Sequence, residues 1–466
     1  MNHLKPPTPK SFFLKTAVLF GLLYVFLLPP GQVPDEPNHF YKAYHISLGH
    51  SQGETKDQRL GGSLPTSLGL FFAHFRRLRY HYDERLSLLD FRQAAKIPLQ
   101  PERLTFQDFP NTAVYTPVGY AWATLTIWGA RVFHLRPVYI FYLVRLSQLF
   151  LWIGMIVLAI SWIPFGKWTL AILALLPSSL WIHCGVTADM VTNGVSFLLL
   201  ALLLKIIYGT QPNRHLDFAL ALGLSAILAS TKIVYSPIFA MAFLIPQHRF
   251  PLSSKPSLQK VLFISLGTAI NLLIINHLYT SSKQRFIAYE DYNPAFRQGQ
   301  QINEGANPKQ QFDYVLHHPI AFAKTMITSY WGSAKATLAH YFGKFGWEKN
   351  YLPGWLIGLL GLSTLGIGFS ERKPWGFQES IFLIGIAISM MIGFALIIYI
   401  QWSPVGGHRI LNLAGRYMIP IFPIFYFVLP SLLGKYRHLF IRLAQVVVIS
   451  SLLWGSVLIG LRYFAV

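Results

Sequence analysis

The feature that most constrains this chain is its series of apolar runs, because many of them are long enough to cross a lipid bilayer. A bilayer core of about 30 Å is crossed by a helix of about 20 apolar residues. The runs predict about eleven transmembrane helices: Phe12–Leu28, Val138–Ile163, Trp168–Gly185, Val191–Ile207, Phe218–Ala229, Ile233–Ile245, Val261–Leu278, Trp355–Gly368, Ile381–Tyr399, Met418–Leu433 and Leu443–Leu461. We therefore predict an all-α polytopic membrane protein in which residues 1–466 form a single transmembrane domain.

The composition supports this class and argues against others. Only 12% of the residues are charged and 53% are hydrophobic, whereas soluble proteins carry about 25% charged residues. The net charge of +21 fits Lys and Arg residues at cytoplasmic helix ends. Because no zinc-finger spacing or basic helix with interleaved aromatic residues occurs, we expect no nucleic-acid partner. The single cysteine, Cys184, lies in an apolar run and is expected to be a packed residue.

The distribution of Lys and Arg predicts the orientation of the chain. The first apolar run is read as a retained span whose N-terminal side faces the cytoplasm. The run Val114–Phe133 is long enough to cross, but a crossing there would move most later Lys and Arg residues outside. We therefore expect it to lie on the outer membrane surface as an interfacial helix. This topology leaves two long outer segments, residues 29–137 and 279–353, and predicts another interfacial helix at Ile320–Phe345 in the second.

A dense polar cluster follows the first predicted span. Asp35 and Glu36 are adjacent carboxylates bracketed by Pro34 and Pro37, and His39 comes three residues later. A carboxylate near an apolar surface can serve as a general base. The pair of carboxylates, assisted by His39, could instead hold a divalent cation such as Mg or Mn. The alternative is a solvated turn in which Asp35 caps a helix.

A second acidic candidate is Asp189, which lies between two apolar runs at a predicted outer hairpin. An ionisable residue at the end of a membrane helix is a functional candidate. Asp189 is equally suited to cap the helix that begins at Met190, and one side chain can serve both purposes.

Several cations are predicted on the outer side, against the usual bias of membrane proteins. Their side chains are suited to bind a phosphate group, or alternatively to contact lipid headgroups: Arg145, Lys232, His408, Arg409 and Arg416. The sequence contains no P-loop, dinucleotide fingerprint, nucleophile elbow or HExxH motif. A cytoplasmic nucleotide site and a zinc protease are therefore not predicted.

The order of these motifs resembles an uncharacterised family of predicted bacterial integral membrane proteins that is allied to the GT-C glycosyltransferases. The resemblance covers most of the chain and depends on these segments: Pro34-Asp35-Glu36-x-x-His39, Tyr115-Thr116-Pro117, Arg145-Leu146, Asp189-Met190 and Gly415-Arg416-Tyr417 with Pro420. It implies a GT-C-like fold in the bacterial inner membrane, with its active face toward the periplasm or exterior. It also implies a polyprenyl-phosphate-linked sugar as donor, with Asp35 as catalytic base or metal ligand and Asp189 as the second acidic position.

The sequence and the resemblance together predict a glycosyltransferase that modifies a surface polysaccharide or a lipid-linked glycan. An outer compartment lacks nucleotide sugars, so an activated sugar would arrive on a lipid with its phosphate at headgroup height. Two alternatives stay open. One is a flippase or transporter of lipid-linked glycans, which would need polar residues through the middle of the membrane. The other is a non-catalytic partner in polysaccharide assembly.

Overall fold

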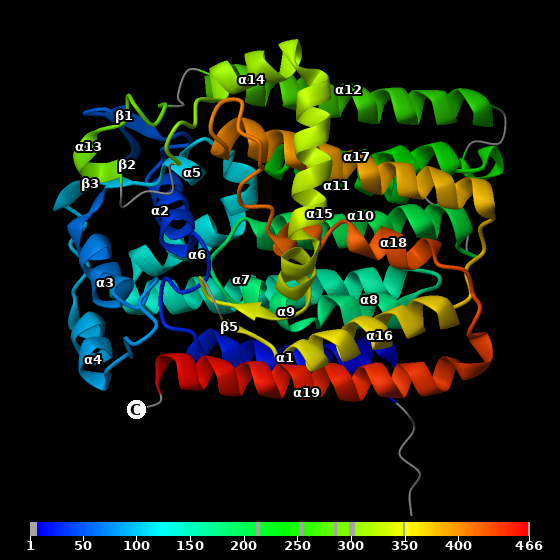
Figure 1. The fold of residues 1–466 in the computed structure, drawn as a ribbon, viewed down its shortest axis with the longest axis horizontal. Helices are drawn as coiled ribbons and strands as arrows, with labels where there is room; N and C mark the ends of the chain where they lie inside the picture. The colour runs from blue at the N-terminus through cyan, green and yellow to red at the C-terminus, as the bar shows by residue number, and fades with distance from the viewer. Residues whose placement is uncertain are drawn as a thin grey trace, which may run out of the picture.

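Long apolar helices lie side by side and form the body of the molecule, as a computed structural model shows for residues 7–210, 215–251, 255–283, 287–297, 303–347 and 350–464 (Figure 1). Within these residues, 6 helices are long and apolar enough to cross a membrane. They are α1 (Pro9–Leu27), α7 (Pro137–Trp162), α10 (Asp189–Tyr208), α12 (Pro256–Lys283), α17 (Phe377–Trp402) and α19 (Arg437–Tyr463). Each coincides with a span predicted from the sequence.

The other predicted spans are shorter or interrupted. Three are short apolar helices: α11 (His215–Thr231), η2 (Ile233–Leu244) and α16 (Gly354–Ser370). Two are broken, into α8 (Lys167–Ala174) and α9 (Pro177–His183), and into η4 (Gly415–Met418) and α18 (Phe422–Val428). Proline lacks an N–H and is tolerated in the first turn of a helix. Pro177 is the first residue of α9 and Pro423 the second residue of α18. The all-α polytopic class is confirmed, while the number of eleven spans stays a prediction.

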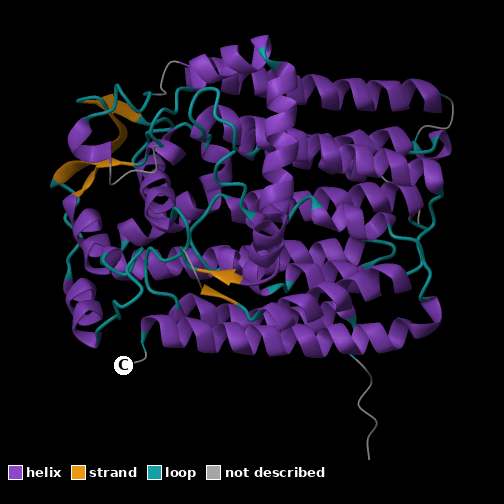
Figure 2. Cartoon of the chain, in the orientation of Figure 1, coloured by secondary structure: helices purple, strands orange, loops and turns teal. Residues whose placement is uncertain are grey.

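The first long outer segment gathers at one end of the long helices, on the left of Figure 1. Its helices are α2 (Glu36–Ser47), α3 (Thr66–Arg76), α4 (Leu88–Lys96), α5 (Pro110–Ala113), η1 (Pro117–Tyr120) and α6 (Ala121–Val132). A small antiparallel sheet, in the order β1 (Glu54–Lys56), β2 (Arg59–Pro65) and β3 (Leu104–Asp108), lies at the same end (Figure 2). Gly61 pairs with Glu54 on one side and with Asp108 on the other. The sequence predicts helices in this segment but not the sheet.

The run Val114–Phe133 forms η1 and α6 rather than one long helix. With 12 residues, α6 is shorter than the roughly 20 residues that a crossing requires. It packs against α2 and α7. These features agree with the expectation that this run does not span the membrane.

The second outer segment includes α13 (Pro294–Arg297), α14 (Pro308–His317), α15 (Pro319–Gly343) and the strands β4 (Lys344–Phe345) and β5 (Asn350–Tyr351). Short 3-10 turns η3 (Gln247–Arg249) and η5 (Gly434–Tyr436) complete the described elements. Figure 1 shows α15 running across the long helices. Ile320 and Trp331 on α15 are 85% and 86% exposed, which suits the predicted contact with lipid.

The helix α10 is the best-covered long helix, with 89% of its apolar window buried. It packs against α7, α11 and η2. This packing fixes its first residue, Asp189, at the end of the molecule where α2 also begins.

The two ends of the helices allow a test of the predicted orientation. Cys184 is fully buried, so the unmodified chain should not react with a membrane-impermeant maleimide. Leu88 in α4 and Leu432 before η5 are 74% and 71% exposed. Figure 1 shows α4 and the start of α19, which directly follows η5, toward opposite ends of the molecule. We expect Leu88→Cys to be labelled in intact cells and Leu432→Cys only after the membrane is permeabilised. The reverse pattern would overturn the orientation.

Candidate functional site

Asp35 stands directly before α2 in an unusual backbone conformation. Its φ angle is +62°, a left-handed conformation that Asp and Asn adopt more readily than most residues. One carboxylate oxygen accepts a hydrogen bond from Asn111 Nδ2 at 3.1 Å. The other accepts one from Arg416 Nη2, also at 3.1 Å. Asp35 is therefore held by residues from two distant segments of the chain and stays 13% exposed.

Asp189 is the first residue of α10 rather than its cap, because the helix begins one residue earlier than expected, and its carboxylate forms a second ion pair. Lys232 Nζ, in the turn between α11 and η2, lies 2.5 Å from Asp189 Oδ1. The backbone N–H of Asp189 donates to Thr187 Oγ1, and no side-chain cap from position 188 is formed. The two side chains are 10% and 14% exposed, so this pair is largely shielded from solvent.

The aromatic ring of Tyr417 joins the two ion pairs. The Lys232 ammonium and the Arg416 guanidinium each lie 4.9 Å from the centre of this ring. Arg416 Nη2 also donates to the Tyr417 hydroxyl at 2.8 Å. The Nε atom of Arg416 is buried and has no hydrogen-bond partner within the described part of the chain. Two cations thus border one aromatic residue, and one of them retains an unused donor.

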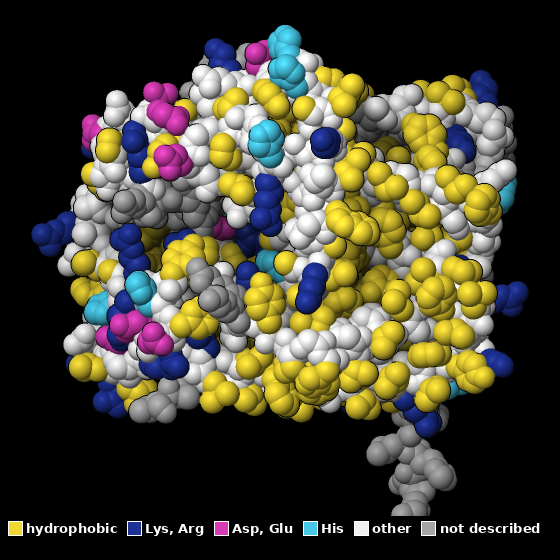
Figure 3. All heavy atoms as spheres, viewed as in Figure 1, with side chains coloured by type: hydrophobic (Ala, Val, Ile, Leu, Met, Phe, Trp, Pro, Cys, Tyr) yellow, Lys and Arg dark blue, Asp and Glu magenta, His cyan; other side chains and the backbone are white. Residues whose placement is uncertain are grey.

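These residues line one cavity of about 1440 Å³ at the outer-segment end of the helices. In Figure 3 this part of the face is hollowed and Lys and Arg side chains gather round it, whereas hydrophobic side chains cover the long helices. Six of the residues predicted for the site are in its wall: Asp35, His39, Asp189, Lys232, Arg409 and Arg416. The cavity is therefore built from stretches that lie far apart in the sequence.

His39 lies one turn beyond Asp35 on α2. Its Nδ1 shares a hydrogen bond of 2.7 Å with the Tyr120 hydroxyl. Burial lowers the pKa of His39 to about 4, so the imidazole is uncharged at neutral pH. In that form it can orient a polar group in the cavity without adding a positive charge.

Glu36 and Arg145 are not in the cavity wall, so the expectation that they act in the site is wrong. They form a fully buried ion pair with both side chains at 0% exposure. Arg145 donates to both Glu36 oxygens and to the backbone carbonyls of Val25, Leu28 and Pro29. A guanidinium has five N–H donors, and these contacts engage all of them. We therefore remove Arg145 from the candidate phosphate-binding group.

The same contacts remove Glu36 from the proposed metal pair. Its two oxygens also accept the backbone N–H groups of Gly31 and Val186. Its carboxylate is thus saturated and does not reach the cavity that Asp35 lines. The side chains of Asp35 and Glu36 point in different directions because Asp35 precedes α2 and Glu36 begins it.

His408 and Arg409 lie in the segment before η4. Both are exposed, and only Arg409 is in the cavity wall. Within the candidate site, we therefore retain Arg409 at the rim and leave His408 out.

The structure adds residues that the sequence interpretation did not select. Asn111 positions Asp35, and Tyr417 borders both cations. At another part of the wall, the Arg79 guanidinium lies 3.6 Å from the centre of the Trp347 ring. Tyr417 could have been selected from the sequence because it is next to Arg416. Asn111 and Trp347 lie in stretches without a recognisable motif.

Gly415 allows η4 to approach α15 closely enough to place Arg416. A Cβ atom at this position would lie 2.1 Å from the Thr337 carbonyl oxygen and 2.5 Å from the Tyr341 nitrogen. We expect Gly415→Ala to destabilise the protein by about 1–3 kcal/mol, the usual range for overpacking. Thermal unfolding in detergent would measure the effect. Gly129→Ala is the matched control, because its Cβ would meet no described atom within 4 Å and Ala favours the helix. Equal stability losses in the two variants would contradict the explanation.

The apolar helices and the polar cavity at their end define a polytopic helical membrane protein. The chain belongs to the family described as Predicted membrane protein (DUF2142), whose match covers residues 18–425. This confirms the uncharacterised membrane-protein family suggested by the sequence motifs. No curated protein and no solved structure matched the chain.

Proposed function

We propose that this protein is a GT-C-like glycosyltransferase that uses a polyprenyl-phosphate-linked sugar on the outer face of a bacterial inner membrane. The observation that carries the proposal is the meeting of Asp35, Asp189, Lys232 and Arg416 around one cavity. Glycosyl transfer requires a proton acceptor for the attacking hydroxyl and positive charge for the departing phosphate. This cavity contains both kinds of group.

The donor phosphate would bind at Arg416 and Lys232. Both cations are paired with carboxylates in the structure, and Arg416 Nε has no partner among the described residues. A phosphate is a stronger partner for a guanidinium than a single carboxylate contact because it can be bound bidentately. Its arrival would therefore draw Arg416 from Asp35 and free the carboxylate for the acceptor.

Asp35 would then accept the proton of the acceptor hydroxyl. The hydroxyl oxygen forms a bond to the anomeric carbon while the bond from that carbon to the phosphate oxygen breaks. The bonding electrons leave with the polyprenyl phosphate, whose added charge Arg416 and Lys232 stabilise, and the anomeric centre is inverted. Asp189 would hold Lys232 in place throughout.

The acceptor would be a surface polysaccharide or a lipid-linked glycan that enters from the outer segments. Trp347 and Tyr80 are in the same cavity wall, and their rings lie 5.6 Å apart between centres. Aromatic rings with an apolar body and a polar edge suit contact with sugar rings. This wall is our proposed site for the acceptor.

The proposal is tested by comparing the lipid-linked sugars and surface glycans of cells with and without the protein. We expect the deletion to accumulate one polyprenyl-phosphate sugar and to lose the same sugar from one glycan. Everted and right-side-out vesicles supplied with a labelled lipid-linked sugar separate transfer from transport. Movement of the intact lipid without formation of a new glycosidic bond would overturn transfer in favour of a flippase.

A further inference from the structure

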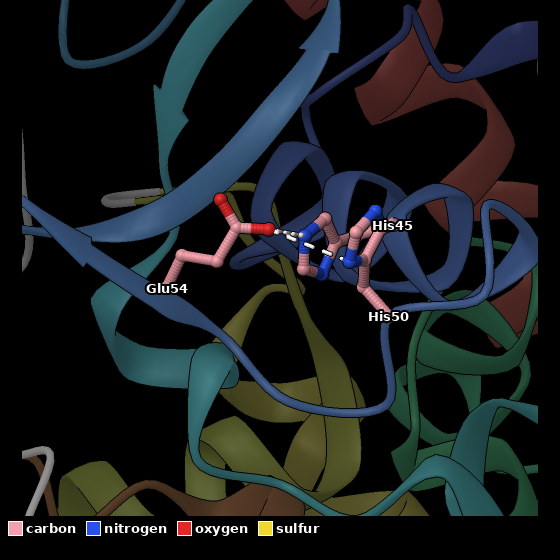
Figure 4. Close-up of side chains that lie close together, drawn as sticks. All are labelled: His45, His50 and Glu54. Carbon is pink, nitrogen blue, oxygen red and sulfur yellow. Dashed lines mark hydrogen bonds and ion pairs between the residues drawn. The ribbon is translucent and has the colours of Figure 1, made fainter.

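A cluster of two histidines and a glutamate lies outside the cavity wall, at the far end of α2 from Asp35 (Figure 4). His45 is in the last turn of α2, His50 follows the end of the helix, and Glu54 begins β1. Their ligand atoms all lie within 4.8 Å of one another. From this arrangement we propose that His45, His50 and Glu54 bind a divalent transition-metal ion, for which Zn²⁺ is the best match.

The distances from Glu54 to the two histidines are close to those expected around a tetrahedral ion. Glu54 Oε1 lies 3.1 Å from His45 Nε2 and 3.5 Å from His50 Nδ1. Ligands about 2.1 Å from a tetrahedral zinc ion are separated by roughly 3.4 Å. One carboxylate oxygen therefore already faces two imidazole nitrogens at the spacing that a shared ion requires, as Figure 4 shows.

The chemistry of the three ligands favours zinc over magnesium or calcium. Two imidazoles and one carboxylate form the mixed nitrogen and oxygen set that zinc accepts, whereas magnesium and calcium prefer oxygen alone. Glu54 and His50 are 41% and 53% exposed, which leaves a route for an ion and for water as a fourth ligand.

The backbone around the cluster is already fixed. Gly49 has a φ angle of +100°, which turns the chain so that the ring of His50 stacks on that of His45, with centres 4.7 Å apart. A Cβ atom on Gly62 of β2 would lie 2.5 Å from the His45 ring, so glycine is required there. Lys42 Nζ donates to the carbonyl of Ser51 and anchors the loop between the ligands. These contacts bring the three side chains close together without an ion.

The bound ion would join the end of α2 to the small sheet. Its effect on the protein would be structural, because none of its three ligands lines the cavity. The inference is independent of the proposed sugar transfer and does not require it.

The test is zinc binding by the purified full-length protein, prepared in detergent with a tag that lacks histidine. After chelator treatment and exchange into metal-free buffer, we expect the protein to take up about one zinc ion per chain and to melt at a higher temperature with zinc than without it. His50→Ala and Glu54→Gln should each weaken zinc binding by about tenfold or more and abolish the thermal shift. Both side chains are partly exposed, so these variants should fold.

His317→Ala is the matched control, because His317 is 69% exposed and also faces a carboxylate, that of Asp313. It should retain full zinc uptake and the full thermal shift. The proposal is overturned if the unmodified protein takes up no zinc above a metal-free blank. It is also overturned if His50→Ala and His317→Ala bind zinc equally well, since zinc would then be held by scattered surface histidines.

Discussion

Replacing Asp35 with Asn is expected to lower sugar transfer by about 100-fold or more, the lower end of what a general base contributes. The amide has almost the same shape but cannot accept the proton of the attacking hydroxyl. Asn also tolerates a positive φ angle, so the backbone conformation at +62° should persist. The measurement is the rate of transfer from a labelled lipid-linked sugar in membranes that contain equal amounts of each variant.

The chain supplies a matched control for this substitution. Asp57, in the turn between β1 and β2, also has a positive φ angle, +51°, and its side chain is exposed. Asp57→Asn makes the same chemical change in a similar conformation away from the cavity and should transfer sugar at the normal rate. Full activity in Asp35→Asn at normal expression would exclude Asp35 as the base.

The second large effect is expected on stability. Glu36→Gln should destabilise the protein by about 3–5 kcal/mol, because removal of one partner leaves a buried charge uncompensated. Arg145 would keep its carbonyl contacts but lose its only carboxylate partner in the described structure. The measurement is the folded fraction that remains after heating in detergent, followed by size-exclusion chromatography.

Two further variants test whether the loss of stability comes from the uncompensated buried charge or from any loss of an ion pair. Glu84→Gln breaks an exposed pair with Arg77, whose side chains are 43% and 44% exposed, and should cost less than about 1 kcal/mol. Combining Glu36→Gln with Arg145→Met removes both charges and should recover part of the lost stability. A double variant less stable than Glu36→Gln alone would contradict this explanation.

The sequence predicted that the main residues of the candidate site lie close together. Asp35, Asp189, Lys232 and Arg416 each come at the outer end of a predicted span, and the ends of spans on one side of a membrane share a plane. Because their depth in the membrane is then the same, only their positions within that plane are left undetermined. The structure places all four in one cavity wall.

The sequence could not show that Asp35 and Glu36 have different roles, because the directions of adjacent side chains change sharply at the start of a helix. The positive φ angle of Asp35 turns its carboxylate toward Arg416, while Glu36 faces Arg145, 109 residues away. Nor could hydropathy distinguish one long span from two short helices. The run Trp168–Gly185 is predominantly apolar, but the helix breaks before Pro177, where a continuous helix would lack a backbone donor.

The link between Asp35 and Arg416 joins positions 381 residues apart. During synthesis, Asp35 is therefore made long before Arg416, and a nascent chain that ends before Arg416 cannot form this contact. Whatever chemistry the pocket performs must await the late insertion of η4 against α15. Premature termination upstream of Gly415 would thus yield a fragment that lacks Arg416, the cation that contacts Asp35.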